Sequence, residues 1–174
     1  MSPATQPNSP HWQLYQTHRA ALFAYAHAIT HSPERAEDAL HDAMVSVART
    51  RTRPDNSKAY VFRAVRNEAY RHAKRYGRDV SLESFDYATL FAAPSDAEPD
   101  AQSSRREEAE LLAKSLDRIS QDEREVIILH LYAGMKFREI AETTQQPLPT
   151  TTSRYRRGLA KLGGILEEVR NEIR

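Results

Sequence analysis

Hydrophobic residues recur every three or four positions along two separate stretches of the chain, which is the spacing of amphipathic α-helices. In residues 11–78 this pattern predicts three helices. Ser32-Pro33 marks the start of the second helix, because serine caps a helix and proline suits its first position. The third runs from about Lys58 to Tyr76. The apolar positions are Leu14, Leu22, Ala26 and Ile29 in the first helix, Ala36, Leu40, Ala43, Met44 and Val47 in the second, and Val61, Phe62, Val65 and Ala69 in the third.

The second stretch, residues 105–174, has the same period. Leu111, Leu112, Leu116 and Ile119 mark one helix. Ser120 with Glu123 predicts a capping box at the start of the next, over residues 122–132, and Gly134 predicts its end. A short helix over residues 137–144 and a turn come before a long helix. Its expected apolar stripe is Leu148, Tyr155, Leu159, Leu162, Leu166 and Val169.

The segment between the two stretches has a different composition. Residues 79–104 contain six acidic side chains, Pro94 and Pro99, and no lysine or arginine. Such a segment predicts a flexible acidic linker, and residues 1–10 predict a disordered tail. The expected fold is therefore all-α, with two small and separately folded helical domains, the second of them a helix-turn-helix.

Composition narrows the function classes only a little. The 174 residues carry a net charge of +1 and no cysteine, which excludes disulfides and thiol chemistry. No apolar run approaches the ~18 residues of a membrane span, and the first residues lack the features of a secretory signal. We expect a cytoplasmic protein without membrane insertion.

Charge is segregated along the chain, although the total is nearly neutral. Seven basic residues lie between residues 58 and 78 against one acid, Glu68, and four lie between residues 148 and 162 with no acid: Lys58, Arg63, Arg66, Arg71, Lys74, Arg75 and Arg78, then Arg154, Arg156, Arg157 and Lys161. Basic helices in both domains favour two contacts with a polyanion. The alternative is that each is a solvated helix face.

The start of the long helix is unusual, because it contains a run of hydroxyl side chains with low helix propensity. In a helix-turn-helix these first turns face the bases of the major groove, where short hydroxyls allow close approach. The predicted DNA-contacting residues of this helix are Thr150, Thr151, Thr152, Ser153, Arg154, Arg156 and Arg157. The alternative is a capped amphipathic helix whose threonines have no such role.

An enzyme is the main alternative class. His27 and His31 have the i, i+4 spacing that can hold zinc, but no third ligand is evident and we interpret both as surface or packing residues. Phosphate-binding loops and nucleophile elbows are absent from the sequence. We expect no enzymatic activity, cofactor or metal.

Specific motifs resemble one known family. The run "ISQDEREVIILHLYAGMKFREIAETTQQPLPTTTSRYRRGLAKL" is similar, without a gap, to "LP..REV..L....G.S..EIA..L..S.GTVKSR..RA...L". This is the pattern of region four of the extracytoplasmic-function sigma factors of bacterial RNA polymerase. The runs "LYQTHRAALFAYAHAITHSPERAEDALHDAM" and "KAYVFRAVRNEAYRHAKR" resemble region two of the same family. The resemblance covers residues 12–76 and 105–166.

The resemblance implies binding to core RNA polymerase, through the β′ coiled coil and the β flap, to promoter DNA, and to an anti-sigma factor. Polymerase would be contacted by Glu37, Asp38, His41 and Asp42. Asn67 matches the asparagine near the minus-ten base, while Arg63, Arg66, Arg71, Lys74 and Arg75 would hold the strand backbones. Thr152, Ser153, Arg156 and Arg157 match the positions that contact the minus-thirty-five duplex.

The sequence also departs from the family pattern at defined positions. His41-Asp42 replaces a Gln-Glu pair, Tyr60 a tryptophan and Arg71 an aspartate, while Gln145 stands for the turn glycine and Pro149 for a later glycine. The altered His41-Asp42 pair keeps one alternative open. In that alternative the protein is a sigma-like binding protein that sequesters an anti-sigma factor or polymerase without starting transcription.

Overall fold

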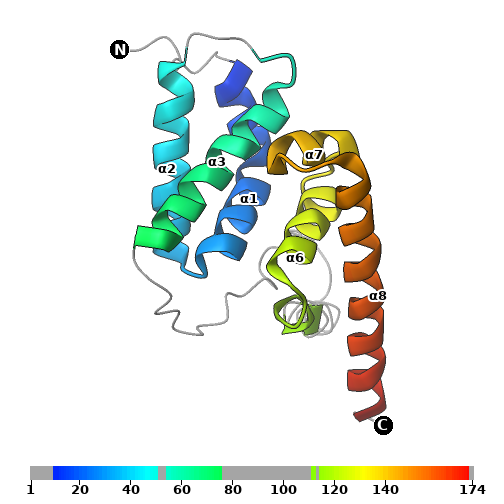
Figure 1. The fold of residues 1–174 in the computed structure, drawn as a ribbon. Coiled ribbons are helices and arrows are strands. Elements are labelled where there is room, and N and C mark those ends of the chain that lie inside the picture. Colours follow the sequence, from blue (N-terminus) through cyan, green and yellow to red (C-terminus); the bar gives the residue numbers. More distant parts are fainter. Residues whose placement is uncertain (1–9, 51–53, 76–110, 113, 173–174) are drawn as a thin grey trace, which may run out of the picture.

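The computed structural model describes residues 10–50, 54–75, 111–112 and 114–172, and within these ranges it contains helices and no strand (Figure 1). The predicted linker and all but the last residue of the predicted tail lie outside them. The elements are α1 (Pro10–Thr30), α2 (Pro33–Arg49), α3 (Ser57–Arg75), α6 (Gln121–Ile127), the π-helix η1 (Ile128–Tyr132), α7 (Phe137–Thr144) and α8 (Leu148–Glu172). The all-α prediction is confirmed.

The first domain is a three-helix unit in which α1, α2 and α3 pack on one another (Figure 1). The Ser32 hydroxyl accepts a hydrogen bond from the Arg35 amide at 3.3 Å, and Pro33 stands at the first position of α2, as the sequence predicts. The fully buried core includes Leu22, Leu40 and Phe62. These belong to the predicted apolar stripes, so the register of all three helices follows from the hydrophobic period.

The second domain begins with the predicted capping box. Ser120 and Glu123 each bind the backbone amide of the other, at 3.4 and 3.3 Å. The helix that follows continues through η1, and Gly134 ends it with φ of 62°. Gln145 ends α7 in the left-handed region with φ of 55°, where the family pattern has glycine. Both helices end where the sequence predicts.

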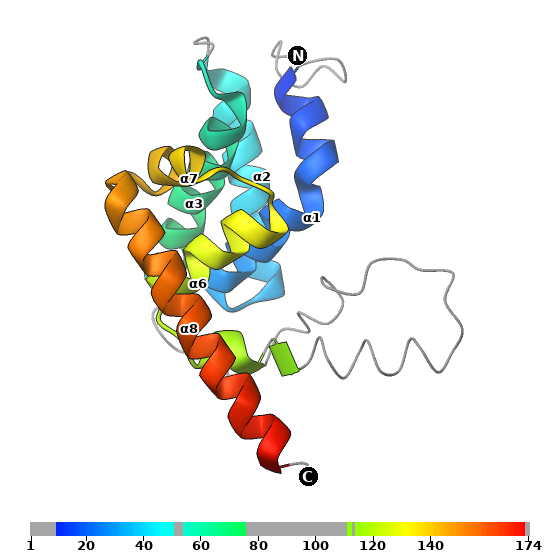
Figure 2. The same cartoon turned by 90° about the vertical axis from the view of Figure 1, so that its right-hand side faces the viewer.

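The buried face of α8 differs from the predicted stripe. Leu159 and Leu148 are each 38% exposed, whereas Thr151 is fully buried together with Gly158, Leu162 and Ile165. These four positions are spaced seven, four and three residues apart, so they share one side of the helix. The helix turns this side to α6, with which it runs side by side (Figures 1 and 2). The predicted stripe was therefore wrong for Leu148 and Leu159 and right for Leu162.

Gly158 allows α8 to approach α6 closely. A Cβ at this position would lie 2.6 Å from Ile127 Cδ1 and 3.1 Å from Glu123 Cβ, whereas a Cβ at Gly163 would meet nothing within 4 Å. Alanine raises helix propensity at both sites, but only at Gly158 does it overpack a contact. We expect Gly163→Ala to stabilise the protein by about 0.5–1 kcal/mol. Gly158→Ala should be less stable than Gly163→Ala by about 1–3 kcal/mol in urea unfolding. Equal gains from both substitutions would show that the helices do not pack this closely.

The two domains are not separate. One continuous cluster of buried side chains joins residues of α1, α2 and α3 to Val126, Leu129, Met135 and Ile140 of the second domain. Helix α7 lies against α3, and α1 contacts both α6 and η1 (Figures 1 and 2). The two predicted domains therefore pack against each other, and each covers apolar surface of the other; that each folds on its own stays a prediction. The C-terminal half of α8 extends beyond this body (Figure 2).

Candidate nucleic-acid interface

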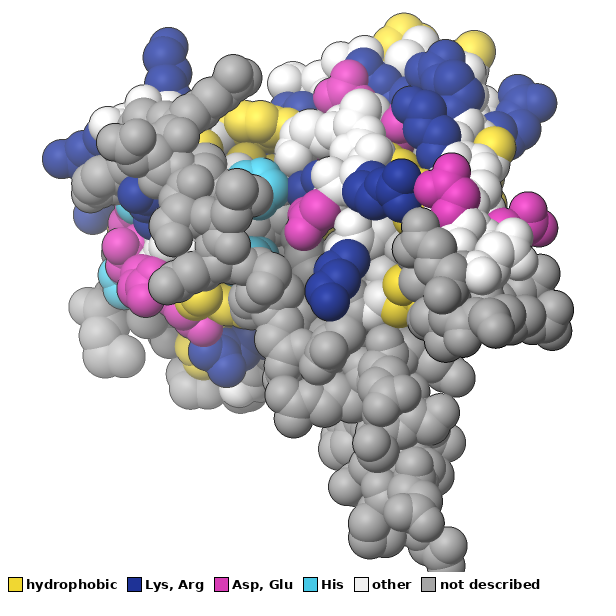
Figure 3. Space-filling model, turned by 90° about the horizontal axis from the view of Figure 1, so that it is seen from below, with side chains coloured by type: hydrophobic (Ala, Val, Ile, Leu, Met, Phe, Trp, Pro, Cys, Tyr) yellow, Lys and Arg dark blue, Asp and Glu magenta, His cyan; other side chains and the backbone are white. Residues whose placement is uncertain are grey.

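The side chains of α3 that the resemblance assigns to DNA fall into two groups. Asn67, Arg71, Lys74 and Arg75, in its C-terminal half, are exposed. Arg63 is half-buried and places its guanidinium 5.9 Å from the centre of the Tyr60 ring. It lines a hollow of about 370 Å³ together with Asn56 of its own domain and Glu142 of the second domain. Viewed from below, lysine and arginine side chains alternate with acidic ones instead of forming an unbroken positive surface (Figure 3).

The sequence predicts that Arg66 faces solvent and contacts DNA, but in the structure its side chain is bound within the protein. Its Nε donates to Glu125 Oε1 at 2.7 Å and its Nη2 to Oε2 at 3.4 Å, so the guanidinium binds the carboxylate through two nitrogens. The Tyr25 hydroxyl donates to the same Oε1 at 2.5 Å. Burial of Arg66 favours a lower pKa, but its hydrogen bonds to Glu125 and the charge of that carboxylate raise the pKa well above its usual value. Burial and the neighbouring Glu125 likewise raise the pKa of Tyr25.

The hydroxyl run at the start of α8 is divided between core and surface. Thr151 is fully buried and its hydroxyl donates to the Pro147 carbonyl at 3.2 Å, so it cannot contact DNA in this arrangement. Thr150, Thr152 and Ser153 are partly exposed. The Thr152 hydroxyl donates to the Leu148 carbonyl at 3.2 Å and to the Pro149 carbonyl at 3.0 Å, so its hydrogen bonds stay within α8.

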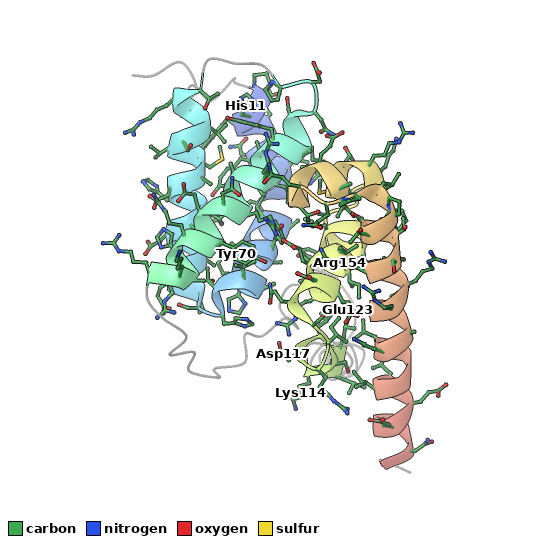
Figure 4. All side chains as sticks on the ribbon, in the orientation of Figure 1. His11, Tyr70, Lys114, Asp117, Glu123 and Arg154 are labelled. Atoms are coloured by element: carbon green, nitrogen blue, oxygen red, sulfur yellow. The ribbon has the colours of Figure 1, made fainter. Side chains whose placement is uncertain are left out.

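The arginines of α8 have different environments. Arg156 is exposed, whereas Arg154 binds Asp122 of α6 at 2.6 Å (Figure 4). Arg157 donates to the Ser153 hydroxyl at 3.2 Å and lies 3.7 Å from Glu123. Lys161 donates to both oxygens of Glu123. Burial favours a higher pKa for Glu123, but the hydrogen bonds from Lys161 and Ser120 hold it below its ordinary value.

The acidic surface of α2 is only partly available to a partner. Glu37, Asp38 and His41 are exposed, and Glu37 makes a surface ion pair with Arg19 at 3.3 Å. Asp42 instead binds Arg71 at 2.8 Å and His72 at 2.9 Å, both on α3. The hydrogen bond to His72 holds the pKa of Asp42 below its usual value although burial opposes this. Asp42 therefore connects the two helices of its own domain.

The histidine pair considered for zinc does not form a site. His27 is buried in the core beside Phe23, with 6.3 Å between the ring centres, and burial lowers its pKa to about 3. Within the described residues, the side chains that come close enough to share a metal ion are Asp42, Glu68 and His72. The Arg71 guanidinium contacts both of these carboxylates, which gives them a cation from the chain itself.

Sequence reasoning missed Glu125 and Tyr25. Glu125 is 1% exposed although it is charged, and its partners lie 100 and 59 residues away in the chain. The available signal was an acid in the run EVIIL, which predicts a carboxylate on an otherwise apolar helix. Such a position requires a partner, because an unpaired buried charge is very costly.

The matches to known proteins agree with this geometry. The family model described as Sigma-70 region 2 matches residues 14–79, and the one described as Sigma-70, region 4 matches residues 109–162. Together they cover more than half of the chain.

Solved structures with the same fold include two complexes. One is the sigma factor RpoE in complex with the anti-sigma factor NepR from Bartonella quintana, with 26% identity, a TM-score of 0.64, and coverage of 89% of this chain and 95% of that one. The other is CnrH in complex with the cytosolic domain of CnrY, with 22% identity, a TM-score of 0.63, and coverage of 95% and 92%. The second likeness shows the fold alone.

The two conserved-region matches, in this order and on this helical framework, define a protein of the sigma-70 family. Within that family the chain belongs to the extracytoplasmic-function sigma factors, whose regions two and four correspond to its two helical domains. Among the described helices, none has an apolar stretch long enough to cross a membrane.

Proposed function

We propose that the protein binds core RNA polymerase and directs promoter-specific initiation of transcription. The observation that carries this proposal is the presence of region two and region four in one chain, with exposed basic residues on α3 and α8. A single basic helix would have a solvated face as an ordinary explanation. This chain has two basic helices, and each is the helix that the family uses for promoter DNA. The pair therefore favours promoter binding.

Region two supplies the proposed minus-ten contacts. Asn67 is exposed and flanked by basic side chains one turn away, so it can approach an unpaired base while Arg71, Lys74 and Arg75 neutralise phosphates. Arg63 and Arg66 belong to the same set, but Arg66 is bound to Glu125 of region four, and Arg63 lines a hollow together with Glu142 of that region.

Region four supplies the proposed minus-thirty-five contacts. Thr152, Ser153 and Arg156 lie on the accessible side of the first turns of α8, where base edges would be reached. Arg157 joins them if it leaves the buried Glu123 carboxylate, which lies 3.7 Å from its Nε. Arg154 is better suited to holding α8 against α6, and Thr151 to the core.

The exposed residues Glu37, Asp38 and His41 of α2 are the proposed contact for the β′ coiled coil, and region four for the β flap. An anti-sigma factor is a further proposed partner. This is supported by the RpoE structure, which was solved in complex with the anti-sigma factor NepR.

Run-off transcription with purified core polymerase tests the proposed function. A library of randomised DNA is transcribed with and without the protein, and the templates that yield transcripts are sequenced. We expect enrichment of a two-part motif only when the protein is present. Tight binding to core polymerase without any enriched template would instead support the sequestering alternative, which the burial of Arg66 favours. Absence of polymerase binding would contradict the proposed function and leave sequestration of an anti-sigma factor as the remaining alternative.

A further inference from the structure

Two carboxylates share one guanidinium where α2 packs beside α3 within region two (Figure 1). Asp42 Oδ2 lies 2.8 Å from Arg71 Nη2 and 2.9 Å from His72 Nε2. The same Nη2 of Arg71 also contacts Glu68 Oε2, one turn earlier on α3. The guanidinium of Arg71 is therefore bound to acids from both helices.

The members of this group differ in how accessible they are. The Arg71 side chain is 61% exposed, whereas those of Asp42 and Glu68 are 39% and 18% exposed. Both contacts of Arg71 use Nη2, so its Nε and Nη1 can donate to a further acceptor. A phosphate oxygen is such an acceptor, and it competes with a carboxylate for the same guanidinium.

Arg71 lies directly beside the residue proposed to approach the minus-ten base. Asn67 stands four positions before it, so the two side chains are neighbours on one face of α3, and both are exposed. A cation at this place attracts the backbone of any strand, because phosphate contacts carry no sequence information. The charge that Arg71 presents therefore affects how strongly binding depends on the base at Asn67.

The two acids reduce the positive charge that a DNA strand meets at this place. An exposed ion pair contributes little and separates readily, so the acids do not hold Arg71 permanently. A phosphate that binds Arg71 must nevertheless displace them, and it approaches two negative charges as it does so. In the sigma-factor pattern the position of Arg71 carries an aspartate, so the pair of Asp42 and Arg71 arises from a departure of this chain.

We propose that Asp42 and Glu68 are specificity-determining residues of the minus-ten surface, because they compete with the DNA backbone for Arg71. They keep the sequence-independent part of strand binding small, so the base contact of Asn67 forms a larger share of the whole. Asp42 acts through Arg71 and is thus a positioning residue that need not touch DNA. The inference rests on the proposed function for the minus-ten strand, whereas the competition for Arg71 is measurable on the protein alone.

Binding of the full chain to a labelled oligo(dT) strand at several salt concentrations measures this competition, because oligo(dT) offers phosphates without a promoter sequence. Asp42→Asn removes the charge and keeps the shape, whereas Asp42→Glu keeps the charge and serves as the rescue variant. The matched control is Glu34→Gln on the same helix. Glu34 is exposed and accepts from the nearby Ser32 hydroxyl, so this variant loses one negative charge away from Arg71.

We expect Asp42→Asn to bind oligo(dT) roughly two- to fivefold more tightly, the range that one exposed ion pair is worth. The slope of log affinity against log salt should become steeper by about 0.7, because one more phosphate of a single strand is neutralised. Asp42→Glu and Glu34→Gln should match the wild type. Glu68→Gln should act in the same direction as Asp42→Asn, and it carries the test if circular dichroism shows that Asp42→Asn loses helical content.

Arg71→Gln establishes whether the effect passes through Arg71. In that background Asp42→Asn should change neither the affinity nor the salt slope, because no guanidinium is left to release. A purely structural role of Asp42 would instead weaken binding, or its effect would persist without Arg71. Equal gains in the two backgrounds, or no gain beyond that of Glu34→Gln, would overturn the proposal.

Transcription of the randomised template library separates this proposal from the proposed function. Holoenzyme is assembled with excess protein, so that a weaker polymerase contact does not limit the result. Asp42→Asn should then enrich a less restricted minus-ten motif than the wild type, and Glu34→Gln the wild-type motif. An unchanged motif despite tighter oligo(dT) binding would overturn the specificity role. If the wild type yields no promoter-specific transcript, the proposed function fails, while the competition for Arg71 stands on the oligo(dT) measurements.

Discussion

Replacing Glu37 and Asp38 together with lysine is expected to weaken binding to core polymerase by roughly 100-fold, or about 3 kcal/mol. Both carboxylates are exposed on α2, and their short side chains suit pairing with basic residues of a partner helix. The Glu37–Arg19 pair is no obstacle, because two exposed charges at 3.3 Å are worth little and separate easily. Lysine at both positions replaces attraction with repulsion.

The double substitution deliberately leaves Asp42 intact. Asp42 holds Arg71 and His72 of α3, so its replacement would disturb the proposed minus-ten surface as well as the polymerase contact. The control is Glu167→Lys with Glu168→Lys on α8, which makes the same change in net charge on exposed positions of the other region. Equilibrium titration with labelled core polymerase gives the affinities. Equal losses from both pairs would mean that net charge, and not the surface of α2, determines the binding.

The sequence predicted best where the physical cause is local. The Ser120–Glu123 capping box, the Ser32-Pro33 start of α2 and the stop at Gly134 each depend on residues within one turn, and the structure confirms all three. The cores of α2 and α3 follow from apolar residues at helical spacing. No knowledge of the partner helix was required for these elements.

Prediction failed where the cause is a contact between distant residues. On α8, the leucines indicated one side, but the close approach to α6 depends on Gly158, whose lack of a side chain carries no hydrophobic signal. Thr151 lies on this buried side, although its short hydroxyl side chain had predicted a DNA contact. Arg66 had the same charge as its exposed neighbours, and only the tertiary fold reveals that Glu125 binds it.

Alanine at both Arg156 and Arg157 is expected to reduce the slope of log affinity against log salt by roughly two for the full chain on a minus-thirty-five duplex. Each arginine that neutralises one phosphate releases about one counterion, so each loss lowers the slope by about one. Neither side chain is buried, which leaves the fold intact. Arg156→Ala alone should account for about half of the change, because each arginine contributes about one counterion.

The hydroxyl side chains of the same helix should behave differently. Thr152→Ala and Ser153→Ala remove groups that can reach base edges, so each should alter the preference among sequences by about 1–3 kcal/mol and leave the salt slope nearly unchanged. Thr151→Ala is the internal control, because this neighbouring threonine is buried and should affect stability without changing the preferred sequence. Binding to duplexes selected from random DNA measures both quantities. If all three hydroxyl variants change sequence preference alike, or if the arginine and hydroxyl variants lose affinity equally on every duplex, α8 binds DNA only through its charge and does not read the promoter.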